Sequence, residues 1–171
     1  YFDVEKDVDI YVGTFSKSLG SIGGFVSTKK DIAEYIRHKA SAFIFTAALP
    51  PASVAGVLEG LDILANDSKR RKRLHENTAF IKRAFFELGI QVNNNLVPIV
   101  PIQIGDEALT LYMNRLLFDD AVFAGVAVSP VVPPLKAMIR TSYTSEHTKK
   151  DLDRILTSFE KNLKKIGILP Q

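Results

Sequence analysis

The start of the chain alternates apolar and polar side chains on either side of a polar loop. Residues 8–13 read Val-Asp-Ile-Tyr-Val-Gly and residues 25–27 read Phe-Val-Ser, and short alternating runs of this kind are typical of strands. The intervening residues 14–24 are rich in hydroxyl groups and glycine, which favours a tightly turning loop. The pattern therefore predicts a strand, a hydroxyl-rich loop and a second strand.

Apolar side chains then recur every three to four positions, which is the spacing of a helix that buries one face. This spacing holds in three segments, residues 29–42, 51–66 and 67–88. The convincing break between the last two is Asn66-Asp67-Ser68, whose polar side chains favour the end of one helix and the start of another. We place a domain boundary at this break, which divides the chain into residues 1–66 and 67–171.

The rest of the chain mixes both periods. Strands are predicted at residues 90–92, 98–104, 125–129 and 137–143, and helices from about Gly105 to Ala124 and from Ser145 or Thr148 through Leu163. Pro98 and Pro101 cannot donate to a strand ladder, so their strand is expected at an edge or with an irregular start. Strands with helices packed on one face make an α+β domain.

Composition excludes several classes of protein. The chain is 46% hydrophobic and 24% charged, with a net charge of +3 and no cysteine, so we expect a globular protein without disulfides or a cysteine-based zinc site. The three histidines have no metal-binding spacing. The densest basic run, residues 69–73, lacks interleaved aromatic side chains, and we read it as a solvated helix face without nucleic acid.

The hydropathy of the chain indicates in which cellular compartment the protein is expected. No apolar run approaches the roughly 20 residues that span a bilayer, and no signal peptide opens the chain. We therefore expect a cytoplasmic protein without a transmembrane segment.

Lys17 is the candidate catalytic residue with the most specific chemistry. It lies in the predicted loop among the hydroxyls of Thr14, Ser16, Ser18 and Ser21. Hydroxyls and loop amides suit a phosphate, and a lysine amine can form a Schiff base with a carbonyl. Pyridoxal phosphate carries both groups, although a lysine in such a loop is more commonly just solvated.

The segment Gly13-Thr14-Phe15-Ser16-Lys17-Ser18, followed by Gly23-Gly24-Phe25, resembles the cofactor-lysine segment of the α-oxoamine synthases. These are fold-type I enzymes that use pyridoxal 5'-phosphate to condense an amino acid with an acyl-CoA. The resemblance is closest to their serine palmitoyltransferase branch. It implies that Lys17 holds the cofactor as an internal aldimine and that Thr14 and Ser16 bind its phosphate.

A second segment, Phe43-Ile44-Phe45-Thr46-Ala47-Ala48-Leu49-Pro50-Pro51, resembles the family's Phe-(Ser/Thr)-x-x-Leu-Pro-Pro signature. In that family the hydroxyl at the position of Thr46 reaches the cofactor phosphate of the partner subunit across a dimer interface. The alternative is a threonine that merely caps the following helix.

Arg140 interrupts the apolar strand predicted at residues 137–143. An arginine there must face solvent or meet an anion, because burying an unpaired charge is costly. Its planar guanidinium fits a carboxylate through two parallel hydrogen bonds. The residues from Val132 to Thr148 resemble the family's proline-rich loop, arginine strand and helix start, which implies that Arg140 grips the substrate carboxylate. The alternative is an ion pair with a surface acid.

The resemblance implies the C-terminal part of a fold-type I large domain over residues 1–66 and a small α+β domain over residues 67–171. It also implies a homodimer that condenses an amino acid with an acyl-CoA, with decarboxylation, as in sphingolipid biosynthesis. Serine is the favoured amino acid. The alternatives are a glycine or alanine acyltransferase, a fold-type I aminotransferase, or a non-catalytic piece. The last is expected if the half of the large domain that precedes the lysine in the family, and that completes the cofactor pocket there, is missing; the chain opens at Tyr1 without an initiator methionine.

Overall fold

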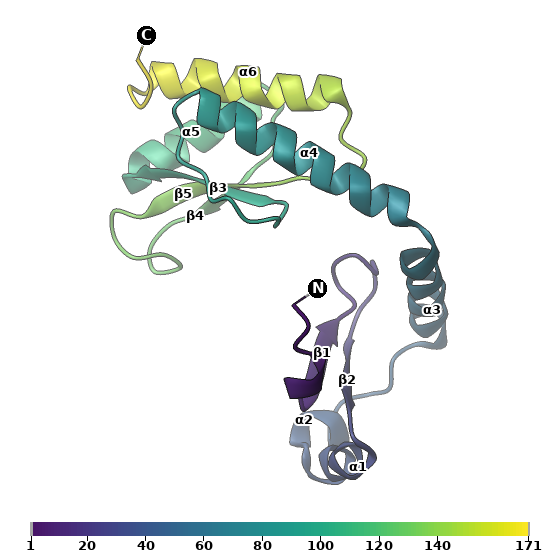
Figure 1. The fold of residues 1–171 in the computed structure, drawn as a ribbon. Helices are drawn as coiled ribbons and strands as arrows, with labels where there is room; N and C mark the ends of the chain where they lie inside the picture. The colour runs from purple at the N-terminus through teal and green to yellow at the C-terminus, as the bar shows by residue number, and fades with distance from the viewer. Residues whose placement is uncertain (1, 171) are drawn as a thin grey trace. The chain divides into compact units, whose positions relative to one another are not determined.

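The computed structural model describes residues 2–170, which divide into two compact units, Tyr1–Ser68 and Lys69–Gln171 (Figure 1). The chain has a mixed α/β fold, in which each unit combines a small sheet with helices. The two units are described separately below.

Unit 1 begins with a short 3₁₀ helix, Glu5–Asp7, and a hairpin of strands β1 (Ile10–Thr14) and β2 (Gly24–Thr28). The strands are antiparallel, and Thr14 pairs with Gly24 where the loop leaves the ladder. The predicted strand–loop–strand pattern is therefore confirmed. The hydroxyl-rich loop between the two strands closes the hairpin.

Three helices complete unit 1, α1 (Lys30–Lys39), α2 (Ser41–Ile44) and α3 (Pro51–Asn66). The helix predicted for residues 29–42 is interrupted at Ala40, whose extended backbone separates α1 from α2. Helix α3 follows the prediction, with Pro51 in its first turn, where no intrahelical N–H bond is lost.

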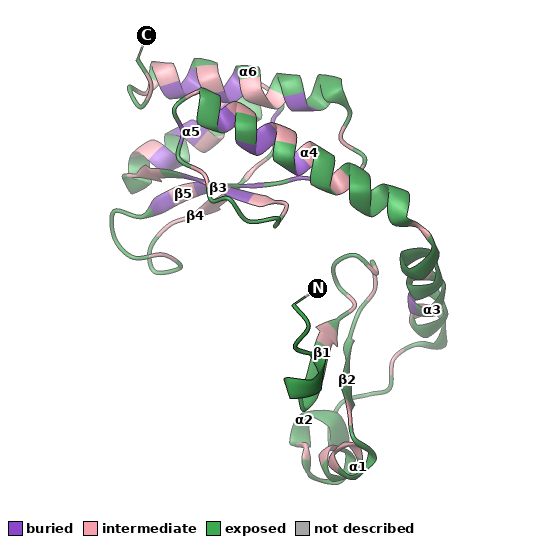
Figure 2. Cartoon of the chain, viewed as in Figure 1, coloured by how far each residue is buried: buried purple, intermediate pink, exposed green. Residues whose placement is uncertain are grey.

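Unit 1 buries very little of its apolar surface. Of its described residues 2–68, only Val57 on α3 is buried, and Figure 2 shows the unit almost entirely exposed. Phe45 is 87% exposed and Val12 on β1 is 76% exposed. Large apolar side chains such as these are more often buried than exposed in a folded protein.

Unit 2 is built on a three-stranded antiparallel sheet in the order β3-β5-β4. Its strands are β3 (Ile99–Gly105), β4 (Gly125–Ala127) and β5 (Ala137–Ser142). The proline-containing strand β3 lies at an edge, as its sequence predicted. The strand that carries Arg140, β5, lies in the centre.

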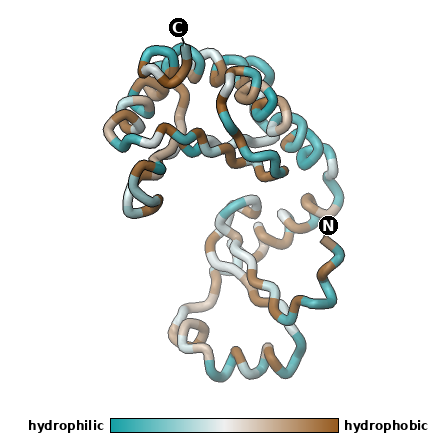
Figure 3. The backbone as a smooth tube through the Cα atoms, turned by 60° about the vertical axis from the view of Figure 1, so that its left-hand side comes forward, coloured by the Kyte–Doolittle hydropathy of each residue, from teal (hydrophilic) through white to brown (hydrophobic). Residues whose placement is uncertain are grey.

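Helices α4 (Ser68–Glu87), α5 (Glu107–Asp119) and α6 (Lys149–Lys165) cover one face of this sheet (Figure 1). Hydrophilic and hydrophobic positions alternate along them in Figure 3, as the amphipathic spacing predicts. The largest fully buried apolar side chains come from all three helices and from two strands: Ile81, Phe85, Val100, Ile102, Met113, Leu117, Ile139, Phe159 and Leu163. The other face of the sheet carries Arg140.

Two predicted elements of unit 2 differ in the structure. Residues 90–92 form no strand, because Ile90 is buried in the helix–sheet core after the turn at Gly89 rather than paired in a ladder. Helix α5 ends at Asp119 instead of Ala124. Ala121 there has a left-handed backbone, with φ of 56°, and the amide of Val122 turns back to the carbonyl oxygen of Leu117 at 2.8 Å.

Candidate functional site

Lys17 lies at the tip of the β1–β2 hairpin, in a loop closed by its own backbone. The amide of Phe15 donates to the carbonyl oxygen of Gly23 at 2.9 Å, and the amide of Ser21 donates to that of Phe15 at 2.9 Å. Within the loop, the amide of Gly20 donates to the carbonyl oxygen of Lys17 at 3.0 Å. The Lys17 side chain is exposed and has no hydrogen bond or ion pair with any residue of the described range 2–170. Its amine is therefore available to a ligand.

Two of the hydroxyls predicted to accompany Lys17 lie together. Thr14 Oγ1 lies 2.8 Å from Ser16 Oγ, and the amide of Ser16 donates to Thr14 Oγ1 at 3.3 Å. Both side chains are exposed at the strand end that leads into the loop. Two adjacent hydroxyls next to an amine form a donor set that suits a phosphate and an aldehyde.

The strands beside the loop approach each other more closely than side chains would allow. A Cβ on Gly24 would lie 2.5 Å from the carbonyl oxygen of Gly13, and a Cβ on Gly13 would collide with the ring of Phe25. That ring also stacks on Phe15, with 5.8 Å between centroids. The pattern of glycines therefore fixes where the loop leaves the hairpin.

Thr46 follows α2 in unit 1 and is exposed. Its hydroxyl donates to the carbonyl oxygen of Ala42, one helical turn earlier. No hydrogen bond joins it to Thr14 or Ser16 in the part of the chain that the structure describes. The hydroxyl would have to leave Ala42 in order to donate to a phosphate.

Arg140 is exposed on the face of the unit 2 sheet that the helices leave uncovered. Its cross-strand neighbours are Pro101 on β3 and Gly125 on β4, neither of which offers a polar side-chain atom. Among residues 2–170 no carboxylate pairs with the guanidinium, so the predicted alternative of a surface ion pair is absent here. The chemistry of this position fits an incoming anion.

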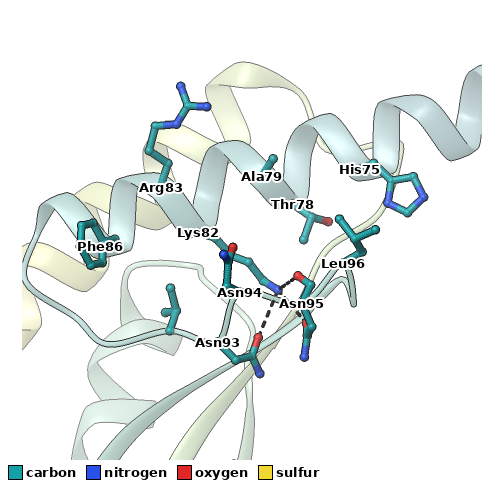
Figure 4. A pocket seen from close by; sticks show the side chains of 11 residues that line it. His75, Thr78, Ala79, Lys82, Arg83, Phe86, Asn93, Asn94, Asn95 and Leu96 are labelled. Carbon is teal, nitrogen blue, oxygen red and sulfur yellow. Dashed lines mark hydrogen bonds between the residues drawn. The ribbon is translucent and has the colours of Figure 1, made fainter.

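A separate hollow in unit 2, of about 490 Å³, lies between α4 and the loop before β3 (Figure 4). Lys82 beside it is only 9% exposed, and burial lowers its pKa. Its ammonium donates to Asn93 Oδ1 at 3.2 Å and to Asn95 Oδ1 at 2.9 Å, and also to the carbonyl oxygen of Asn95. Lys82 therefore has its three donors occupied and holds the loop in place rather than offering a ligand site.

Within the described range, no group of three or more histidine, cysteine, aspartate or glutamate side chains could hold a metal ion. No helix there is both long and apolar enough to cross a bilayer.

Sequence reasoning missed the residues that support the loop from α3. Ser21, expected among the hydroxyls near Lys17, donates instead to the carbonyl oxygen of Ser53 at 3.4 Å. Leu19 packs against Gly60. The one signal in the sequence was Gly60 inside a predicted helix, because a glycine in a helix interior can mark a close contact with another segment.

Comparison with known proteins identifies relatives over nearly the whole chain. The family model described as aminotransferase class I and II matches residues 1–159. A serine palmitoyltransferase of Bacteriovorax stolpii is 42% identical over 170 residues, which are 99% of this chain and 40% of that protein. An 8-amino-7-oxononanoate synthase of Thermoanaerobacter pseudethanolicus is 38% identical over 169 residues, 99% of this chain and 43% of that protein.

Solved structures agree with these sequence matches. Serine palmitoyltransferase of Sphingomonas wittichii superimposes with a TM-score of 0.92 and 28% identity, over 98% of this chain and 42% of that one. An 8-amino-7-oxononanoate synthase of Francisella tularensis gives a TM-score of 0.81 at 28% identity, over 92% of this chain and 46% of that one. The chain thus spans less than half the length of the relatives that it matches.

Proposed function

The chain belongs to the aminotransferase class I and II family, and from this premise we propose a pyridoxal-phosphate-dependent acyltransferase that condenses an amino acid with an acyl-CoA and releases CO₂. The observation that carries the proposal is Lys17, exposed and unpaired among the described residues at the tip of its hairpin loop. Serine is the favoured amino acid, in keeping with 42% identity to a serine palmitoyltransferase.

The residues around Lys17 fit the cofactor. Thr14 and Ser16 present two hydroxyls 2.8 Å apart that can donate to phosphate oxygens, and the Lys17 amine can bond to the aldehyde carbon with loss of water. When bound, pyridoxal phosphate supplies an electron sink for negative charge at the Cα of the amino acid.

Arg140 and Lys17 then have separate tasks. Arg140 would bind the carboxylate of the incoming amino acid through two parallel hydrogen bonds. The Lys17 side chain, as a free amine, would take the proton from the Cα of the substrate. That carbon attacks the thioester carbonyl, coenzyme A leaves as the thiolate, the substrate carboxylate leaves as CO₂, and a proton returns to Cα.

The assembly that we propose is a homodimer in which Thr46 reaches the cofactor phosphate of the partner subunit. Its support is the exposed position of Thr46 and the exposed apolar surface of unit 1, which a second subunit could cover. If serine is the amino acid, we propose that the acyl-CoA carries a long chain and that the enzyme acts in sphingolipid synthesis.

A second candidate is the same condensation with glycine or alanine. It has its support in the 38% identity to an 8-amino-7-oxononanoate synthase. The two candidates share Lys17 and Arg140 and differ in the amino acid and the acyl chain.

The test uses the purified full-length protein loaded with pyridoxal phosphate. Borohydride reduction followed by peptide mass spectrometry should locate the pyridoxyl group on Lys17, and Lys17→Ala should abolish both the label and turnover. Release of free coenzyme A, followed with a thiol reagent for serine, glycine and alanine, should identify the amino acid. Amino-group transfer to a keto acid without release of coenzyme A would instead indicate an aminotransferase, and undiminished turnover by Lys17→Ala would rule out the site.

A further inference from the structure

The loop that carries Lys17 is attached to α3 and the residues before it by successive contacts within unit 1. Leu19 packs against Gly60, the hydroxyl of Ser21 donates to the carbonyl oxygen of Ser53 at 3.4 Å, and Gly23 meets Leu49. As the loop advances, its partners come from progressively earlier residues. The loop therefore runs antiparallel to this segment.

Gly60 is an unusual residue for its position, because glycine in a helix interior costs about 1 kcal/mol relative to alanine. A Cβ on Gly60 would lie 3.0 Å from Leu19 Cδ2, closer than side chains normally pack. Helix α3 contains a second glycine, Gly56, where an added Cβ would meet nothing within 4 Å. The absent side chain of Gly60, unlike that of Gly56, thus makes room for a residue of the loop.

Leu19 lies where it can set the direction of the Lys17 side chain. It lies two residues after the lysine, inside the turn that the amide of Gly20 closes onto the carbonyl oxygen of Lys17 at 3.0 Å. On the other side of Lys17, the ring of Phe15 is held by stacking on Phe25. Since the Lys17 side chain has no partner among residues 2–170, its direction depends on these two flanking anchors.

We propose that Gly60 and Leu19 form a positioning pair for Lys17. Leu19 seated on Gly60 fixes the backbone turn from Lys17 to Gly20, and hence the direction in which the amine extends toward its electrophile. The pair touches neither cofactor nor substrate. This inference rests on the proposed function of Lys17, and it adds two residues to which the resemblance gave no role.

The experiment compares Gly60→Leu with Gly56→Leu in the full-length protein. Both changes place the same good helix former on the same helix, so that the Leu19 contact is the difference between them within unit 1. Gly60→Leu should accelerate amide hydrogen exchange of residues 15–21 in the apoprotein, whereas Gly56→Leu should leave it unchanged. With pyridoxal phosphate added, Gly60→Leu should slow borohydride-trapped attachment at Lys17 by about ten- to a hundredfold, because misplacing a reacting group by about 1 Å can cost that much.

A size exchange completes the test. Leu19→Ala alone should loosen the turn, and Leu19→Ala combined with Gly60→Leu should restore attachment toward the wild-type rate, since the new leucine fills the vacated space. If Gly60→Leu does not fold, the milder pair Gly60→Ala and Gly56→Ala gives the same comparison, with the Leu19 side chain displaced by a few tenths of an ångström.

The outcomes separate the two proposals. Equal exchange and equal attachment rates in the Gly60 and Gly56 variants would overturn the positioning pair. A wild-type protein that never bonds pyridoxal phosphate at Lys17 would overturn the proposed function, while the exchange comparison in the apoprotein would still decide whether Gly60 fixes the loop.

Discussion

The Nζ atom of Lys161 on α6 lies 2.8 Å from Oδ1 of Asp120, the C-cap residue that follows α5. Ser158 and Asn162 donate to the other carboxylate oxygen at 2.8 Å each. Hydrogen bonds from Lys161, Ser158 and Asn162 lower the pKa of Asp120 to about 2. This carboxylate therefore connects α5 to α6 as long as it stays ionised.

The pH dependence of stability follows from that shift. Because the pKa of Asp120 is lower in the folded state, its contribution is fully present above the unfolded value of about 3.9 and disappears as pH falls toward 2. We expect Asp120→Asn to lower the melting temperature at pH 6, and we expect the gap from wild type to close as pH falls from 4 to 2. Thermal unfolding followed by circular dichroism measures this, and a gap that stays constant down to pH 2 would show that the ionised form is not what stabilises the contact.

Lys82 should matter for stability and not for chemistry. Lys82→Met keeps the aliphatic stem but leaves the oxygens of Asn93 and Asn95 without their donor, at a cost of about 1–2 kcal/mol because water can partly replace it. Arg83→Met, on the same helix but exposed, is the matched control and should be nearly neutral. Urea unfolding gives both values, and equal stabilities of the two variants would contradict the role of Lys82.

Arg140 should matter for the amino acid and not for the acyl-CoA. A charge-assisted contact contributes roughly 1.5–3 kcal/mol, so Arg140→Ala should weaken amino-acid binding by about ten- to a hundredfold. Arg140→Lys should recover only part of this, because an ammonium cannot make the planar two-point contact. Spectral titration of the cofactor-loaded full-length protein with serine, glycine and alanine measures the loss. Wild-type affinity in Arg140→Ala for all three would make the arginine structural.

Thr46 should affect retention of the cofactor. Thr46→Ala removes a hydroxyl that we propose for the phosphate, and it should speed loss of pyridoxal phosphate on dialysis without lowering the melting temperature. Thr28→Ala is a suitable control, because that hydroxyl also donates locally, to the carbonyl oxygen of Asp9 at 2.7 Å. A monomeric protein that retains its cofactor tightly would contradict the role across the dimer interface.

Local patterns predicted the parts of the fold that depend on neighbours in sequence. The hairpin around Lys17 follows from alternating side chains and glycines, and the start of α5 follows from Asp106, which accepts from the amide of Leu109 at 2.7 Å. The end of α5 could not be predicted in this way. Ala121 has a left-handed backbone there without the glycine that usually marks one, and the partners of Asp120 come from a helix some forty residues later.

The candidate site also combines features set by neighbours in sequence with features set by distant residues. Thr14, Ser16 and Lys17 are neighbours in sequence, and the structure brings the two hydroxyls together. The support of Leu19 by Gly60 joins segments about forty residues apart, so no short pattern could contain it. The ligand-binding roles of all five residues, Thr46 and Arg140 included, rest on resemblance and stay predictions.

The strand order of unit 2 has a consequence for how the protein folds during synthesis. Strand β5 lies between β3 and β4 but follows both in the chain. Until it leaves the ribosome, each edge strand lacks the partner with which it forms its ladder, and α6, which closes the core, comes later still. Unit 2 therefore completes its sheet only after residue 142 has left the ribosome, and until then β3 stays an unpaired strand that other chains can reach.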